Sequence, residues 1–302
     1  MTSPRVAALA VAFLMLAVAL QAYAAEKTFD RTYAASPGGR LKVSTDVGDV
    51  TVTADGGSSV RVLVKMKGRE KDLEKFEVEA RETGGGVEVT GKVRSSGWGF
   101  WNSWDSEVTF TIAVPKEYNV RVSTAGGDIG VNGVRGEVDG ETSGGDVRIA
   151  SVEGRISAET SGGDIAVESV GGDVKAQTSG GDIRVSGARG RLELSTSGGD
   201  IQARDVDGRI AAETSGGNIT IAATGDNQGI AAETSGGDIE ISIKRSAGAN
   251  IEAVTWGGDV SCDLPVTMQG KMSEGQIKGT INGGGNPIRA KTSGGDVKIK
   301  GI

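Results

Sequence analysis

Apolar and polar residues alternate along most of this chain in short runs that are separated by glycine-rich turns. In the unit that follows the turn at residues 160–164, Ile165, Val167 and Val170 are apolar and polar or small residues lie between them. A second turn follows, after which Val174 and Ala176 continue the alternation. A period of two is the pattern of a β-strand with one buried face. Each unit therefore predicts two short strands joined by two turns.

The five-residue turn Thr-Ser-Gly-Gly-Asp returns at a fixed interval. Copies or close variants begin every 18 residues at Thr124, Thr142, Thr160, Thr178, Thr196 and Thr214, and then at Thr234, Thr255 and Thr292 with spacings of 20, 21 and 37. A period near 20 residues is typical of a solenoid, in which each unit buries its apolar face against its neighbours. The sequence predicts an all-β fold: a β-solenoid of the parallel β-helix or β-roll type, with 18-residue rungs of two strands.

The two ends of the chain are less regular than its middle. Residues 25–122 show a less regular form of the alternation and are expected to form irregular β rungs, with one short helix over residues 70–76. Residues 123–302 are expected to form the regular repeat solenoid together with a C-terminal cap. The cap is expected where Pro265, Met268 and Pro287 interrupt the pattern, and the turn that begins at Thr292 belongs to the last rung in the sequence.

The residues of the repeated turn have separate expected roles. Glycine is expected to supply the positive-φ conformations that the tight chain reversal requires, and the Ser and Asp side chains are expected to bind free turn amides. The β-branched Thr is expected to stack on its copies as a ladder of hydroxyl groups. Trp256 occupies a Ser position of one turn, where it could add a second aromatic contact spot, although we expect it to pack over an adjacent turn.

The N-terminus has the pattern of a secretory signal peptide. Arg5 precedes an apolar run over residues 6–20, and Ala22-Tyr23-Ala24 has the small-x-small form of a cleavage site. We expect cleavage after Ala24, so that residues 1–24 are removed and the mature protein is periplasmic or extracellular. No later apolar stretch reaches the roughly 20 residues that a spanning helix needs, so no transmembrane span is expected in the mature chain.

Composition excludes several classes of function. The chain of 302 residues has no His, which removes the usual general base and the commonest metal ligand. Cys262 is the only cysteine, so no intrachain disulfide forms. The formal net charge is −7 and no dense basic patch occurs, which argues against a nucleic-acid partner. No cofactor is expected.

The repeated aspartates are the first candidate site. Asp146, Asp164, Asp182 and Asp200 fall in one register and are expected to form a column. They could form a calcium ladder like that of repeat-in-toxin β-rolls. However, those rolls follow Gly-Gly-x-Gly-x-Asp-x-apolar-x, and one regular Asp per rung supplies few of the six to eight oxygens that calcium takes. The favoured interpretation is structural: each Asp accepts hydrogen bonds from turn amides.

A tryptophan-rich loop over residues 95–105 is the second candidate. Trp98, Phe100, Trp101 and Trp104 lie close together there, between glycines and serines. The rings could cap the open end of the solenoid core. Alternatively, they could form an exposed contact site for a membrane, a sugar or a protein. The loop is the candidate binding site for an unknown envelope component.

A polysaccharide-active β-helix enzyme is the third possibility. Such an enzyme needs a pair of carboxylic acids that departs from the repeat. Only Asp105 and Glu107 lie beside an unusual loop, whereas nearly all the other Asp residues of the turns keep the register of the repeat. The sequence therefore favours a protein that is not an enzyme.

The mature chain resembles the bacterial putative-adhesin family of domains of unknown function. The resemblance rests on Val114-Pro115, on the segment Asn119 to Thr124 that leads into Gly-Gly-Asp, on the repeated turns, and on Asn282 to Ile288 near the end. It implies a toast-rack-like β-solenoid without a catalytic residue set. We therefore expect a non-enzymatic secreted or periplasmic protein of the cell envelope that acts as a binding or scaffolding surface.

Overall fold

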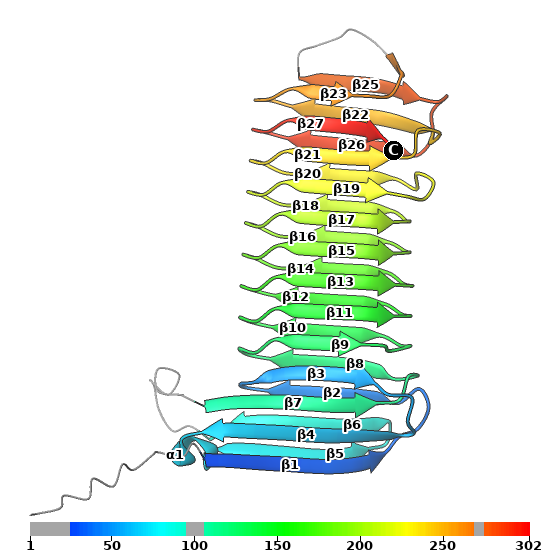
Figure 1. Cartoon of the computed structure of the whole chain (residues 1–302). Coiled ribbons are helices and arrows are strands. Elements are labelled where there is room, and N and C mark those ends of the chain that lie inside the picture. Colours follow the sequence, from blue (N-terminus) through cyan, green and yellow to red (C-terminus); the bar gives the residue numbers. More distant parts are fainter. Residues whose placement is uncertain (1–24, 95–105, 269–274) are drawn as a thin grey trace, which may run out of the picture.

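The computed structural model describes residues 25–94, 106–268 and 275–302, which form a rod of two stacked β-sheets (Figure 1). Sheet A contains, in stacking order, β1 (Ala25–Ala34), β4 (Ser59–Gly68), β7 (Ser106–Val114), β3 (Asp49–Ala54), β9 (Ile129–Asn132), β11 (Val147–Val152), β13 (Ile165–Val170), β15 (Ile183–Ala188), β17 (Ile201–Val206), β19 (Ile219–Ala223), β21 (Ile239–Ile243), β27 (Val297–Gly301) and β23 (Val260–Cys262). Sheet B contains β24 (Val266–Met268), β25 (Gln276–Ile281), β22 (Ala249–Thr255), β26 (Pro287–Thr292), β20 (Ile230–Glu233), β18 (Ile210–Glu213), β16 (Leu192–Ser195), β14 (Val174–Gln177), β12 (Ile156–Thr160), β10 (Val138–Thr142), β8 (Asn119–Thr124), β2 (Arg40–Thr45), β6 (Gly86–Val93) and β5 (Phe76–Thr83). The predicted all-β solenoid is confirmed.

The regular rungs have the predicted in-and-out pattern. Ile165, Val167 and Val170 on β13 and Val174 and Ala176 on β14 are at most 2% exposed. Each strand pairs in parallel with the strand one repeat later, so that identical positions stack on one another. Since aliphatic residues of similar size meet in every rung, the core is a thin continuous layer between the two sheets.

The first part of the chain departs from this regularity through antiparallel strands. β1 pairs antiparallel with β4, and β5 pairs antiparallel with β6. The one helix of the described residues, α1 (Glu70–Leu73), is shorter than the predicted segment 70–76. Phe76 instead begins β5 and packs edge-on against Phe110, with 6.4 Å between ring centroids. Burial of this ring in the end of the core ends the helix early.

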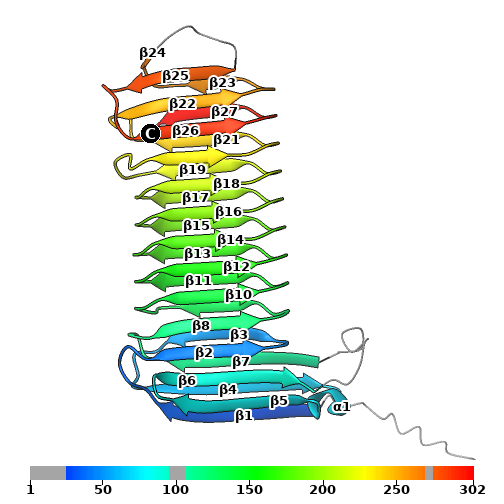
Figure 2. The ribbon, with the colours of Figure 1, turned by 180° about the vertical axis from the view of Figure 1, so that it is seen from behind.

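Near both ends of the rod, the order of the rungs differs from the order of the sequence (Figures 1 and 2). The rung of β2 and β3 precedes the other rungs along the chain. In space it lies between β6 and β7 on one side and β8 and β9 on the other. The pair β26 and β27 comes last but lies between β20 and β21 on one side and β22 and β23 on the other. The edge strands β1 of sheet A and β5 and β24 of sheet B each pair antiparallel with their neighbours. The other edge strand of sheet A, β23, is parallel to its neighbour β27.

Among the described residues, no helix is long and apolar enough to cross a lipid bilayer.

Candidate functional site

The threonines of the repeated turns lie inside the rod and join successive rungs. Thr160 is 3% exposed, and its hydroxyl donates to the carbonyl oxygen of Gly145 in the preceding rung at 2.9 Å. The same hydroxyl accepts the amide of Gly163 in its own turn at 3.3 Å. The predicted ladder of hydroxyl groups is therefore wrong. The turn backbone offers each hydroxyl both a donor and an acceptor, and these backbone groups must find partners when they are buried.

The aspartates of the turns form a continuous hydrogen-bonded ladder. Oδ1 of each residue accepts the backbone amide of its counterpart in the next rung, at 2.7–2.9 Å. In stacking order the ladder is Asp49, Asp128, Asp146, Asp164, Asp182, Asp200, Asn218, Asp238, Asp296 and Asp259. The interpretation of these residues as acceptors of turn amides is confirmed, with the amide supplied by the next rung.

Two arginines on the outer face of sheet A hold pairs of these carboxylates. Arg148 contacts Oδ2 of Asp128 at 3.4 Å and Oδ2 of Asp146 at 2.7 Å. Arg184 makes the same contacts with Asp164 at 3.2 Å and Asp182 at 2.6 Å. Each guanidinium bridges two rungs, so it offsets the repulsion between stacked carboxylates.

These contacts leave little reason for the ladder to bind calcium. Within the residues that the structure describes, no group of three or more acidic or cysteine side chains is placed to hold a metal ion. Oδ1 of each candidate, Asp146, Asp164, Asp182 and Asp200, already has an amide partner.

We therefore expect the melting temperature of the protein to be the same in millimolar calcium and in chelator. Thermal unfolding followed by circular dichroism measures this directly. A specific site would stabilise the folded state by about 2.7 kcal/mol at a calcium concentration one hundred times its Kd, which would be visible as a rise in melting temperature. Such a rise would restore the calcium ladder as a function of the column.

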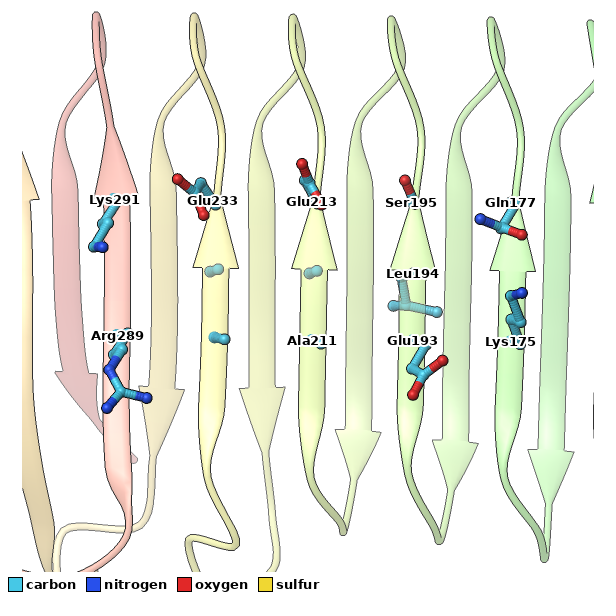
Figure 3. A pocket seen from close by; sticks show the side chains of 13 residues that line it. Lys175, Gln177, Glu193, Leu194, Ser195, Ala211, Glu213, Glu233, Arg289 and Lys291 are labelled. Carbon is cyan, nitrogen blue, oxygen red and sulfur yellow. The ribbon is translucent and has the colours of Figure 1, made fainter.

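A hollow of ≈ 260 Å³ lies on the outer face of sheet B (Figure 3). Its floor includes Ala211 and Ala231, which point outward from β18 and β20 at positions where neighbouring strands carry longer side chains. Charged residues of both signs surround this floor: Lys175, Glu193, Glu213, Glu233, Arg289 and Lys291. The hollow is an open depression with an alanine floor and a charged rim, a form that suits contact with a larger partner better than enclosure of a substrate.

Sequence reasoning missed this hollow, although part of the signal was present. The four residues Ile-Ala-Ala-Glu occur twice, at 210–213 and 230–233, and put two small outward side chains in successive rungs. The sequence could not show that Arg289 and Lys291 also border the hollow. Their strand, β26, lies beside β20 only because the last rung is inserted between earlier ones.

Two titratable groups outside the ladder of turn carboxylates have environments that change their pKa. Glu88 on β6 binds Lys42 at 2.8 Å and Arg81 at 2.6 Å, and these two hydrogen bonds lower the pKa of its carboxyl to about 2. Burial raises the pKa of the Cys262 thiol. Neither arrangement is that of a catalytic acid or nucleophile at neutral pH, because the carboxyl stays ionised and the thiol stays protonated.

The predicted contact loop lies outside the described residues, as do Trp98, Phe100, Trp101, Trp104 and Asp105. Glu107, the second carboxylate of the hydrolase alternative, is exposed on β7.

Trp256 is placed differently from the prediction. Its side chain is 72% exposed, so it does not pack over an adjacent turn. The neighbouring turn offers mainly Ser293 and Gly294, which give an indole ring too little apolar surface to cover.

Comparison with known proteins gives a family match along most of the rod. The Toastrack DUF4097 family model matches residues 39–300. The crystal structure of a putative adhesin from Bacteroides fragilis NCTC 9343 is similar over 91% of this chain and 97% of that chain, with 16% identity and a TM-score of 0.46. That of a putative lipid binding protein from Parabacteroides distasonis ATCC 8503 is similar over 91% and 96%, with 15% identity and a TM-score of 0.48. No curated protein matches the chain.

Proposed function

The chain belongs to the Toastrack DUF4097 family, and from this premise and the geometry above we propose that it is a non-enzymatic protein of the bacterial cell envelope. Its rigid solenoid acts as a binding and scaffolding surface for another envelope component. The main support for this proposal is that the repeated polar side chains of the turns form hydrogen bonds with the backbone of the rod itself. Thr hydroxyls and Asp carboxylates of the turns bind the backbone of adjacent rungs, as Thr160 and Asp164 do. The repeat thus supports a rod rather than a reaction centre.

The outer faces support the same proposal. Outward residues of both sheets are mostly polar and of mixed charge, and the hollow over β18 and β20 opens on the outer face of sheet B. Interfaces that form and dissociate are about as apolar as the rest of a protein surface, so a face of mixed polarity is compatible with one. The stacked hydrogen bonds between rungs keep these surfaces at a fixed spacing, so the partner meets a preorganised face.

The N-terminal segment supports location in the envelope. We propose that residues 1–24 direct export and are removed, so that the mature chain begins at Ala25. We also retain the loop at residues 95–105 as a proposed contact site, because three tryptophans within seven residues are costly to expose without a partner.

The test is a pull-down from envelope fractions with the mature protein isolated from the exporting host. The wild type is compared with a triple variant, Trp98→Ala with Trp101→Ala and Trp104→Ala, and with a hollow variant, Glu213→Lys with Glu233→Lys. We expect the wild type to retain a protein, glycan or lipid. Loss in the triple variant alone assigns contact to the loop, and loss in the hollow variant alone assigns it to sheet B.

Melting temperatures of all three proteins serve as the control for folding. A triple variant that melts much lower than the wild type would identify the tryptophans as a cap of the core instead of a contact site. A wild type that captures nothing above an unrelated rod-shaped protein, or that releases sugars from envelope polysaccharide, would contradict the proposed function.

A further inference from the structure

One turn of the repeat carries an exposed aromatic ring, Trp256, that is not part of the core. In the described turns of the Thr-x-Gly-Gly-Asp type, the second position is Ala125, Ser143, Ser161, Ser179, Ser197, Ser215, Ser235, Ser293 or Trp256. Trp256 is 72% exposed. An indole left in water contributes nothing to the core, and a serine fits this position equally well in neighbouring rungs. Packing therefore does not account for the tryptophan.

A free carboxylate lies in the same turn. The backbone amide of Asp259 binds Oδ1 of Asp296 at 2.9 Å, which makes Asp259 the last member of the ladder. Its strand, β23, is the edge of sheet A, so no further rung of the described chain supplies an amide to it. The side chain is exposed and has no hydrogen-bond or ion-pair partner among the described residues. The ladder thus ends in an acceptor that is available to a ligand.

The two groups together fit the chemistry of a sugar ring. The flat face of an indole can stack on the C–H groups of one face of a pyranose, and a carboxylate can accept hydrogen bonds from its hydroxyl groups. Both groups belong to one tight turn, Thr255–Asp259, and both side chains are exposed. A combination of one apolar platform and one charged acceptor is what orients a polar ligand in a shallow site.

Other ligands fit this turn less well. Asp296 and Asp238 continue the carboxylate column next to Asp259, so an anionic lipid surface is repelled. A protein partner normally needs several buried anchors, whereas Ser293 and the turn glycines add almost no apolar area around Trp256. We propose that the turn Thr255–Asp259 binds a pyranose residue of an envelope glycan. This proposal rests on the proposed function and names one ligand class for it.

The experiment is a binding measurement on an array of pyranose oligosaccharides that includes chito-oligosaccharides and glycan strands prepared from peptidoglycan. The mature full-length protein is compared with W256S, which restores the residue of the other turns, and with D259N, which keeps the shape of the side chain. We expect the wild type to bind at least one of these glycans. Binding should weaken about tenfold in W256S and several-fold in D259N.

The matched control is S235A, which alters the same position of another turn and should bind like the wild type. All variants should melt at the wild-type temperature, because these side chains are exposed. Absence of glycan binding by the wild type, or equal binding by W256S, overturns the proposal. Loss in W256S of binding to phosphatidylglycerol vesicles, with no glycan bound, overturns it as well. In each case the pull-down of the previous subsection still decides the general binding function independently.

Discussion

Replacing Val297 by Asp is expected to destabilise the protein by about 4 kcal/mol or more, whereas the same replacement of Val260 should cost about 1 kcal/mol. These two valines are direct partners in sheet A, on β27 and β23. Val297 is 0% exposed, because β27 lies between β21 and β23. Val260 is on the edge strand and is only partly buried. A carboxylate at position 297 would be enclosed in the core, whereas one at position 260 can reach water.

This pair of variants tests the order of the rungs, since residue type and register are matched. Thermal unfolding should show a fall of about 10 °C or more for Val297→Asp and of only a few degrees for Val260→Asp. If the rungs stacked in the order of the sequence, Val297 would lie in the terminal rung and Val260 in an internal one, and the ranking would be reversed. A larger effect at position 260 would therefore disprove insertion of the last rung.

The second large effect is expected from Gly163→Ala, at about 3 kcal/mol. A Cβ atom at Gly163 would lie 2.0 Å from the carbonyl oxygen of Gly145 and 2.4 Å from its carbonyl carbon. Both atoms belong to the backbone of the preceding rung, and they are fixed by the hydrogen bond from Thr160. The rungs would have to separate locally, which would weaken that bond and the packing beneath it.

The adjacent glycine of the same turn is the control. At Gly162 a Cβ atom would have no neighbour closer than 3.8 Å, so Gly162→Ala should change the free energy of unfolding by less than about 0.5 kcal/mol. Reduced freedom of the unfolded chain could even stabilise this variant slightly. Chemical denaturation of the two variants and the wild type measures both differences. Equal effects at the two positions would show that close contact between rungs does not require the second glycine.

The two pairs of variants test features that depend on contacts between rungs, which the local sequence does not show. Neither Gly162 nor Gly163 has a positive φ, so the predicted conformational role of the turn glycines is wrong. Their roles differ because only Gly163 lies against the backbone of the preceding rung, and the sequence shows them as identical letters. The helix over 70–76 was predicted from local composition, but Phe76 joins a strand because its ring packs against Phe110. Likewise, the threonine hydroxyls bind the turn backbone rather than each other, since buried amides must find partners.

The solenoid, the length of its regular rungs and the inward side of each strand could all be predicted from the amino-acid sequence. These follow from local rules, because a strand with a period of two has only one apolar face and a fixed repeat must stack on itself. The neighbours of the rungs at the two ends, and therefore the residues that surround the hollow on sheet B, are known only from the folded structure. All rungs offer nearly the same surfaces to each other, so the pattern of residues permits several stacking orders. Chain connection and closure of the end strands select one of them.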